Sequence, residues 1–386
     1  IINSMNILIS PQSYKGSISA LNTAKAISIG VKNVLPEANT IILPVADGGD
    51  GTLETLVDVS NGQIKPCKVL DPLGVLIDSN WGGMDDNNTA VIEMAKMSGL
   101  ALVEPEKRNP MFTTTYGLGE TIKHALDEGY RDFIIGIGGS ATNDGGVGMA
   151  QALGGLFLDS SGEQIKYGAE GLSKLVKIDL SNMDDRLQET KFLVASDVTN
   201  PLLGELGASA VYGPQKGASK EMIPILEKAM INYVDVAKKS LELDVSEVPG
   251  SGAAGGLGAG LMMFVNAELK PGVDIVLDKI NFNKYLNNID LVITGEGQMD
   301  YQTVYNKAPY GVALRAKKFD IPVIGISGSL GDSFQDVNDN GIDAVTSISQ
   351  GAMNLDQLTA SVSELIIEST EQVMRFIKVG SKLDFN

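Results

Sequence analysis

The chain has 386 residues, more than one hydrophobic core usually holds, and we therefore expect two domains. Its 48 acidic and 30 basic residues give a formal net charge of −18, which argues against nucleic acid or an anionic membrane surface as a partner. One cysteine, Cys67, and one histidine, His124, exclude a disulfide framework and any zinc site that needs several such residues. Catalysis is therefore expected to use carboxylates, lysines, hydroxyls and backbone amides.

Strand and helix alternate through the first seventy residues. An apolar strand over 7–10 is followed by a helix over 21–31, for which Ser17 or Ser19 is the expected N-cap. A second strand over 40–45 and a helix over 52–59 follow. This βαβα order predicts a parallel sheet that is covered on both faces.

The middle of the chain has a different character. Short strands separated by turns are predicted between 65 and 94, and a strand–turn–helix unit is predicted over 133–153. A strand over 192–195 then leads into a loop and a long polar helix over 221–243. Alternation of strand and helix returns only in the last third, with predicted strands over 290–295, 322–328 and 344–348.

We therefore predict an α/β fold with two domains. One is a doubly wound, flavodoxin- or Rossmann-like domain split between the chain ends, residues 5–70 plus 285–386. The other is an inserted α/β domain, residues 71–284, which carries the GGSATNDGG loop and a second glycine-rich loop.

No segment resembles a targeting signal or a membrane anchor. The four residues before Met5 are left out of the fold prediction, and no charged and apolar signal pattern precedes that residue. The longest uncharged stretch, 249–267, is rich in glycine, which predicts a loop running into a helix and not a transmembrane span. A cytoplasmic protein is expected.

Glycine is unusually frequent: 44 residues, about 11% against an average of about 7%. Many of these glycines fall in loops that follow predicted strands and also contain an acidic or basic residue. Ligands bind at the carboxyl edge of parallel sheets, where such loops lie, although any single loop is also explained as a tight turn with a capping Asp. The loops are residues 11–16, 47–51, 138–146, 196–201 and 295–300.

The common nucleotide motifs are largely missing. The dipeptide Gly-Lys does not occur, so a standard Walker A loop is excluded. Residues 136–141 form a GxGxxA pattern between a predicted strand and helix, with Asp159 about twenty residues further on. A second glycine pattern at 250–255 follows no strand. An NAD(P)-dependent hydroxy-acid oxidoreductase therefore remains an alternative.

Glycine loops, carboxylates and isolated lysines are the groups that phosphoryl transfer needs. Carboxylates hold Mg²⁺ or accept a hydroxyl proton, and lysines with backbone amides neutralise phosphate oxygens. Lys15, Lys216 and Lys307 lie beside Gly, Pro or Gln and not on a polar helix face, although a solvated surface lysine is the alternative for each.

At these loops the sequence resembles the bacterial type of glycerate kinase, type I. The resemblance implies Mg-ATP-dependent phosphorylation of a hydroxyl of D-glycerate, at the 2- or the 3-position, in a cleft between two α/β domains. It leaves a homo-oligomer open. The segments that carry it include SPQSYKGSISA (10–20), LPVADGGDGT (43–52), RNPMFTTTYGLGE (108–120), IGIGGSATNDGGVGM (135–149), GSGAAGGLGAGL (250–261), LVITGEGQMD (291–300) and KAPYGVA (307–313).

Within this family we assign roles as hypotheses. The expected catalytic residues are Lys15, Asp47, Asp197, Asp300 and Lys307. Asp47 and Asp197 are the candidates for Mg²⁺ ligand and general base, and their order is open. Thr113–Thr115 are explained equally well as a helix N-cap cluster. The expected substrate- and phosphate-binding residues are Ser13, Arg108, Ser140, Thr142, Asn143, Asp144, Lys216, Gly255, Gly256 and Glu296.

The sequence departs from the family pattern in two loops. Gln12 stands where an Asp is usual, and Gln298 stands where an Arg is usual. Because the two losses are complementary in charge, we favour a compensated exchange, with a catalytically weakened hydroxy-acid-binding homologue as the alternative. His124 is expected on an exposed helix face and Cys67 in the core.

Overall fold

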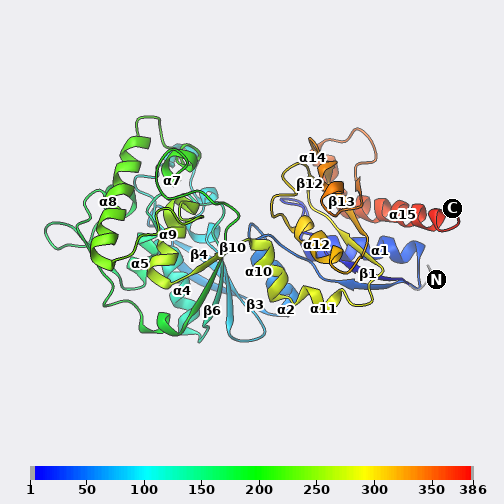
Figure 1. The fold of residues 1–386 in the computed structure, drawn as a ribbon, viewed down its shortest axis with the longest axis horizontal. Helices are drawn as coiled ribbons and strands as arrows, with labels where there is room; N and C mark the ends of the chain where they lie inside the picture. Colours follow the sequence, from blue (N-terminus) through cyan, green and yellow to red (C-terminus); the bar gives the residue numbers. More distant parts are fainter. Residues whose placement is uncertain (1–4, 384–386) are drawn as a thin grey trace. The chain divides into compact units, whose positions relative to one another are not determined.

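The computed structural model describes residues 5–383, and contacts between residues divide the chain into two units (Figure 1). Each unit contains a sheet with parallel strands and several helices, so the predicted α/β fold class is confirmed. The predicted domains, 5–70 plus 285–386 around 71–284, stay a prediction. Unit 1 contains the residues up to Asp47, Glu54–Val59 and those from Val273; unit 2 contains Gly48–Leu53 and Ser60–Gly272.

The sheet of unit 1 has five parallel strands in the order β15-β13-β11-β1-β2. Numbered within the sheet, this is the flavodoxin-like order 2-1-3-4-5, with its switch point between β1 and β11. Ile7, Leu8 and Ile9 of β1 are fully buried, which explains the continuous apolar run. The strands are β1 (Asn6–Ile9), β2 (Asn39–Ile42), β11 (Leu291–Thr294), β13 (Val323–Ser327) and β15 (Ala344–Ser347); a small parallel pair is β12 (Gln298–Met299) with β14 (Ser329–Leu330).

Helices α1 and α15 pack against each other in unit 1 (Figure 1). A Cβ added to Gly30 of α1 would lie 2.6 Å from Cβ of Thr370 in α15, so only glycine permits this approach. Ser19 caps α1 by accepting from the amide of Asn22, as predicted. The helices with residues in unit 1 are α1 (Ala20–Val34), α2 (Thr52–Ser60), α10 (Gly272–Lys279), α11 (Phe282–Tyr285), α12 (Ala308–Lys317), α13 (Asp336–Asp339), α14 (Leu355–Ala360) and α15 (Val362–Gly380).

Unit 2 contains a mixed sheet in the order β10-β9-β6-β5-β4-β3. The first four strands run parallel, and β4 is antiparallel to both of its neighbours, β5 and β3. Cys67 lies in β3 and is buried, as predicted. The strands are β3 (Gln63–Leu70), β4 (Leu76–Gly83), β5 (Thr89–Glu93), β6 (Asp132–Gly136), β9 (Lys191–Ala195) and β10 (Glu268–Lys270); β7 (Leu156–Leu158) and β8 (Lys177–Asp179) form a separate antiparallel pair.

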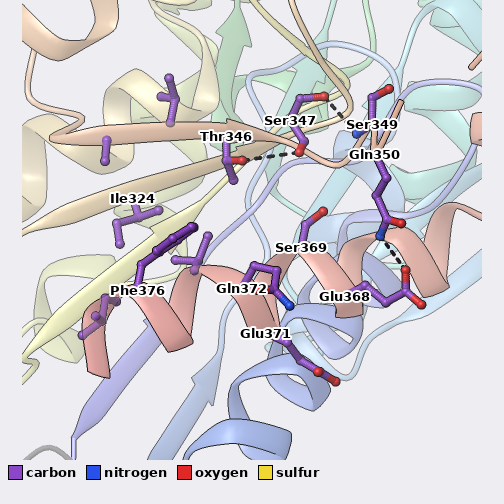
Figure 2. A pocket seen from close by; sticks show the side chains of 14 residues that line it. Ile324, Thr346, Ser347, Ser349, Gln350, Glu368, Ser369, Glu371, Gln372 and Phe376 are labelled. Carbon is purple, nitrogen blue, oxygen red and sulfur yellow. Dashed lines mark hydrogen bonds between the residues drawn. The ribbon is translucent and has the colours of Figure 1, made fainter. Parts of the chain in front are cut away.

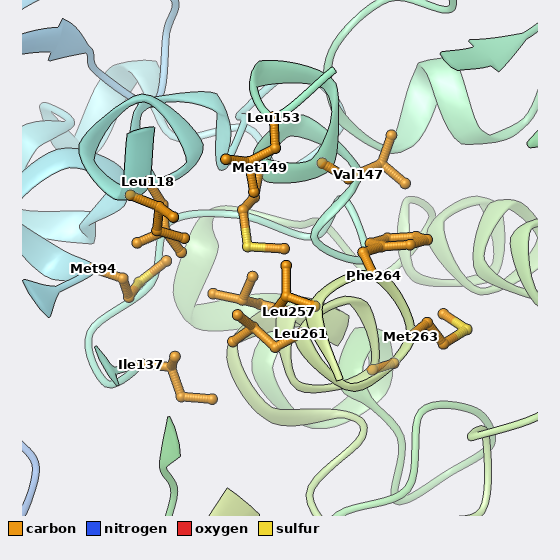
Figure 3. Packing of buried hydrophobic residues seen from close by; sticks show 14 of the residues in the cluster. Met94, Leu118, Ile137, Val147, Met149, Leu153, Leu257, Leu261, Met263 and Phe264 are labelled. Carbon is orange, nitrogen blue, oxygen red and sulfur yellow. The ribbon is translucent and has the colours of Figure 1, made fainter. Parts of the chain in front are cut away.

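The core of unit 2 is built largely from helices that pack on one another. Figure 3 shows Met149 of α5 beside Leu257 and Leu261 of α9, with Leu118 of α4 nearby. His124 is exposed on α4, as predicted. The helices are α3 (Ala95–Ser98), α4 (Tyr116–Asp127), α5 (Val147–Ala152), α6 (Gly168–Leu172), α7 (Ala208–Tyr212), α8 (Ile223–Leu241) and α9 (Ala253–Val265), with short 3₁₀ turns that include η5 (Pro214–Lys216).

The uncharged stretch 249–267 forms a loop and the helix α9, as predicted. Ala254, Gly255 and Gly256, at the start of α9, have φ of 53°, 70° and 84°, so the backbone there is left-handed and the regular helix begins after them. Within residues 5–383, the helices all fall short of the length and apolar character that a bilayer crossing requires.

Candidate functional site

The loops after β1 and β11 leave the sheet of unit 1 on either side of its switch point. They are joined by a hydrogen bond from the amide of Gln12 to the carbonyl of Gly295 at 2.8 Å. Tyr14, 3% exposed, donates from its hydroxyl to the carbonyl of Ile326 at 2.7 Å, and burial raises the pKa of this phenol. The switch point is where ligands bind in doubly wound sheets, so these fixed loops mark the expected ligand side of unit 1.

Glu296, directly after Gly295, is a buried carboxylate with 5% exposure. Burial raises its pKa to about 7, and the nearby charges of Asp47 and Asp300 add to this rise. Two groups oppose it: the hydroxyl of Thr303 donates to Oε1 at 2.8 Å, and Nζ of Lys307 lies 3.9 Å from Oε2. Four of the predicted site residues therefore interact electrostatically in unit 1: Asp47, Glu296, Asp300 and Lys307.

Asp300 and Gln298 form the outer part of this cluster. The side-chain Nε2 of Gln298 donates to Oδ2 of Asp300 at 3.0 Å, and the backbone amide of Gln302 donates to Oδ1 at 2.8 Å. Within residues 5–383, Gln12 and Gln298 share no hydrogen bond, because Gln298 instead contacts Asp300 and Ser329. The structure thus gives the suggested Gln12–Gln298 compensation no direct contact.

The predicted residues of unit 1 differ in how exposed they are. Ser13 and Asp47 are half-buried, whereas Lys15 is exposed at a turn closed by backbone bonds between Tyr14 and Ile18. Lys307 is the N-cap residue of α12 and is partly exposed. Both lysines can therefore reach a charged ligand.

The donor chemistry of this cluster suits a hard cation. Asp47, Glu296 and Asp300 supply only oxygen atoms, and Mg²⁺ in kinase sites is held by one or two carboxylates together with substrate phosphates. Residues 5–383 contain no group of three or more His, Cys, Asp or Glu side chains arranged to hold a metal by themselves. The oxygen donors of this cluster fit a hard cation that is bound together with substrate phosphates.

In unit 2, the glycine loop 137–146 follows β6 and the loop 196–201 follows β9, its neighbour in the sheet. Asp144 in the first loop is 1% exposed. Its Oδ2 accepts from the amide and hydroxyl of Thr115 at 2.8 and 2.9 Å and from the amide of Gly148, while Oδ1 accepts from the amide of Gly146. Burial raises the pKa of Asp144, and these four donors oppose the rise. Asp144 therefore organises the loop.

Next to Asp144, the side chains of Thr142 and Asn143 are fully buried. Nδ2 of Asn143 donates to the hydroxyl of Ser209 at 3.2 Å, while Oδ1 of Asn143 and Oγ1 of Thr142 have no hydrogen-bond partner. Buried polar atoms are usually hydrogen-bonded in native proteins, so these two atoms are candidates for contact with a bound ligand or a water.

Lys216 lies in the same region, 4% exposed, and its Nζ donates to the carbonyl of Thr142 at 2.6 Å. Burial lowers the pKa of Lys216 to about 7, and the charge of Asp144 partly opposes this effect. Because its nitrogen is used inside the protein, Lys216 supports the loop here; its predicted contact with phosphate stays a prediction.

The other predicted residues of unit 2 differ in their exposure. A Cβ on Gly255 would lie 1.9 Å from the carbonyl of Thr142, so this glycine permits α9 to approach the loop, with Gly256 beside it. Ser140 is buried, whereas Arg108 is half-buried and donates from Nε to the carbonyl of Val103. Asp197 is exposed and accepts from the amide of Gly272 at 3.1 Å.

Sequence reasoning missed four side chains that support these groups: Thr303, Ser327, Ser209 and Tyr233. Ser327 lies within hydrogen-bonding distance of the carbonyl of Glu296, and Tyr233 donates to the carbonyl of Gly145. Each of the four forms a hydrogen bond with a residue that lies between 7 and 88 positions away along the chain. No local pattern could have indicated them.

A doubly wound sheet with carboxylates and a lysine at its switch point, together with a second glycine loop in unit 2, is typical of an α/β enzyme of the phosphoryl-transfer class. Comparison with known proteins makes this specific. The model of the glycerate kinase family matches residues 7–378, and the chain belongs to that family. It is therefore a kinase that phosphorylates a hydroxyl group, and the suspected resemblance is confirmed.

Several bacterial proteins are similar to the chain over nearly their full length. The glycerate kinase of Bacillus subtilis is 49% identical over 98% of this chain and 99% of its own. The glycerate 2-kinase of Escherichia coli is 46% identical, with 98% and 99% covered. A crystal structure from Salmonella typhimurium, of a protein assigned as a glycerate kinase 2, superposes with a TM-score of 0.91 at 46% identity and covers 98% of this chain and 100% of its own.

Proposed function

We propose that this protein transfers the terminal phosphate of Mg-ATP to a hydroxyl of D-glycerate. The observation that carries the proposal is the cluster in unit 1, where Nζ of Lys307 lies 3.9 Å from the buried Glu296 and the charges of Asp47 and Asp300 raise the pKa of that carboxyl group. Phosphoryl transfer needs carboxylates for the metal and the hydroxyl proton, and cations for the phosphate oxygens. The close similarity to glycerate kinases supports D-glycerate as the acceptor.

Roles follow from charge and exposure. Lys15 and Lys307 are accessible cations that would neutralise phosphate oxygens or the carboxylate of glycerate. Asp300, half-buried and held by the amide of Gln302, is suited to accept the proton of the reacting hydroxyl. Asp47 and Asp197 remain the candidates to hold Mg²⁺, which would neutralise charge on the nucleotide phosphates.

The loop of unit 2 would bind the substrate. Thr142 and Asn143 each have one unpartnered polar atom, and the backbone of Gly138 and Gly139 is exposed beside Ser140. A small polyhydroxy acid or a phosphate could satisfy such groups. Arg108, Gly255 and Gly256 keep their predicted roles in the same region.

We propose the 2-hydroxyl as the phosphorylated position. This choice is supported by the 46% identity to the E. coli protein named a glycerate 2-kinase. Phosphorus NMR of the product formed from D-glycerate and Mg-ATP distinguishes the two phosphoglycerates directly. A 3-phosphoglycerate product would overturn the choice of position and leave the kinase activity intact.

A coupled assay of ADP release with D-glycerate tests the activity itself. We expect turnover that requires Mg²⁺ and falls by at least about a hundredfold in Asp300→Asn, since general bases contribute about 10²–10⁴-fold. An unchanged rate in Asp197→Asn would remove Asp197 from the mechanism. Lack of turnover at millimolar glycerate would contradict the proposal.

The Gln12 and Gln298 departures favour one second candidate, a protein that binds hydroxy acids with weakened catalysis. Calorimetry that detects glycerate binding without phosphoryl transfer would support it. The double variant Gln12→Asp, Gln298→Arg restores the usual family residues. A large gain in its rate would indicate eroded activity, whereas no change or a fall is expected if the exchange is compensated.

A further inference from the structure

A groove of about 940 Å³ lies in unit 1 between the strand β15 and the helix α15. Figure 2 shows Thr346 and Ser347 on the strand side, facing Ser369, Gln372 and Phe376 of the helix. Gln350 spans one end of the groove and donates to the carboxylate of Glu368. The groove therefore has an apolar end at Phe376 and a charged end at Glu368.

The strand side of this groove is a sheet edge. One edge of β15 pairs with β13, and in the part of the chain that the structure describes no strand pairs with its other edge. Unpaired edges attract further chains, and proteins usually cover them. On the helix side, Phe376 is 75% exposed and Val379, one turn later, is 57% exposed. Large apolar side chains exposed beside a groove indicate a contact surface.

The charges of α15 are divided between its two halves. Glu364, Glu368 and Glu371 occupy the first half, and Arg375 and Lys378 occupy the second. Arg375 lies 3.6 Å from Glu371 on the next turn, yet its side chain remains 58% exposed. The helix thus presents a negative stretch followed by a positive stretch, and a second helix of the same sequence would complement it when antiparallel.

We infer that the groove and the exposed face of α15 form the contact between two copies of this chain, related by a two-fold axis beside Glu371 and Gln372. Along α15, Glu368 lies as many residues before this axis as Arg375 lies after it. Antiparallel pairing therefore places Glu368 of each copy level with Arg375 of the other. Phe376 of each copy comes to lie beside the turn at Glu368–Ser369 that lines the other copy's groove.

A two-fold axis doubles each of these contacts, because the same surface serves both copies. The contact is built on one helix of 19 residues and a short strand edge, which is small for a permanent dimer. We therefore expect a reversible dimer that forms as concentration rises from about 1 to about 100 µM. Sedimentation or light scattering of the intact chain over this range measures it, and a monomer throughout would overturn the inference.

Charge exchange tests the register. Glu368→Lys and Arg375→Glu should each weaken dimerisation by about tenfold or more, because each change creates two repulsive pairs. The double variant restores opposite charges and should recover dimerisation. As a matched control, Asp235→Lys reverses a charge on the exposed face of α8, also a 19-residue helix, and should leave the dimer unchanged. A dimer that is insensitive to the α15 changes would place the contact elsewhere and overturn the inference.

A crosslink tests the axis without altering any charge. Gln372→Cys brings two thiols beside the two-fold axis, so a short bismaleimide should join the copies, while Asp235→Cys should give no such product. The native Cys67 is buried and provides little background. Crosslinking by neither variant, in a protein that sediments as a dimer, would contradict the proposed axis. Glycerate phosphorylation measured in parallel is expected to be unchanged by Glu368→Lys.

Discussion

Nζ of Lys216 donates a 2.6 Å hydrogen bond to the backbone carbonyl of Thr142 in the interior of unit 2. The two residues are 74 positions apart, and the bond ties the 3₁₀ turn η5 to the glycine loop after β6. A buried lysine of this kind makes the stability of the protein depend on pH.

For Lys216 the direction of this dependence follows from its pKa. The unfolded chain keeps the lysine protonated up to about pH 10.5, whereas burial lowers the pKa in the folded chain to about 7. Unfolding therefore takes up a proton between these values, and the free energy of unfolding rises with pH across this window. Lys216→Met should remove this contribution, so the advantage of the wild type over the variant should grow by about 2 kcal/mol between pH 7 and pH 9.

Urea unfolding at several pH values measures that difference. Lys228→Met, on the exposed surface of α8, is the control and should keep the pH dependence of the wild type. Parallel pH profiles for the wild type and Lys216→Met would show that Lys216 remains charged in the folded protein.

Asp144 should be far more important to folding than an exposed Asp that also accepts several hydrogen bonds. Asp144→Asn replaces an acceptor with a donor next to the amides of Thr115 and Gly148, which leaves buried donors unsatisfied. We expect a loss of about 2–4 kcal/mol in the free energy of unfolding and a reduced kinase rate.

The matched control for this change is Asp159→Asn. Asp159 also accepts from several donors, among them the amide and hydroxyl of Ser161, but it lies in a surface turn. Denaturant unfolding of both variants compares them, and we expect the smaller loss for Asp159→Asn because water can replace its bonds. If both variants lose the same free energy of unfolding, burial does not explain the importance of Asp144.

Gly255→Ala should destabilise unit 2 strongly. Its φ of 70° is left-handed, and the added Cβ would lie 1.9 Å from the carbonyl of Thr142. Backbone strain and overpacking together should cost about 3 kcal/mol, measured by the shift in the urea midpoint. Gly138→Ala is the control in the same region, since nothing lies within 4 Å of its Cβ and its φ is not left-handed. A comparable loss of stability in Gly138→Ala would show that the added methyl group alone causes the effect, and not the left-handed backbone or the close contact at Gly255.

Thr303 should tune the ionisation of Glu296. Its hydroxyl donates to Glu296 and favours the charged carboxylate, so Thr303→Val should raise the pKa of Glu296 further above its present value of about 7. If activity needs the ionised form, the acidic limb of the kcat/KM profile should move to higher pH. Thr303→Ser keeps the hydroxyl and should leave the limb in place. If the acidic limb of the kcat/KM profile stays in place in Thr303→Val, the ionisation of Glu296 does not cause the observed pH dependence.

Much of the fold could be predicted from the sequence because its signals are local. The apolar run of β1 and the return of strand–helix alternation after residue 290 indicated a doubly wound sheet built from both chain ends, and the order β2-β1-β11 agrees. The glycine loops were found because they follow strands. Ser361 separates the helices α14 and α15, and no local pattern in the sequence indicated this break.

The roles inside the site were harder to predict, because burial depends on residues that are distant in the chain. Lys216 was interpreted as a phosphate ligand from its Gly and Pro neighbours, yet its exposure is set by packing against the loop around Thr142. Asp144 was interpreted as a substrate contact, and its four donors include two from Thr115. Only the folded structure shows which of these charges face inward.

The pairing of β1 with β11 also has a consequence for biosynthesis. Asn6 and Asp290 are joined across 284 positions, so β1 lacks one of its two neighbours, β11, until most of the chain has been made. At about 5–20 residues per second, a ribosome takes roughly 15–60 s to cover that separation. All strands of unit 2 are complete by residue 270, so that unit can fold during this interval. During this interval the edge of β1 that will pair with β11 remains unpaired. We therefore expect the nascent chain to be most exposed to aggregation or chaperone binding at this time.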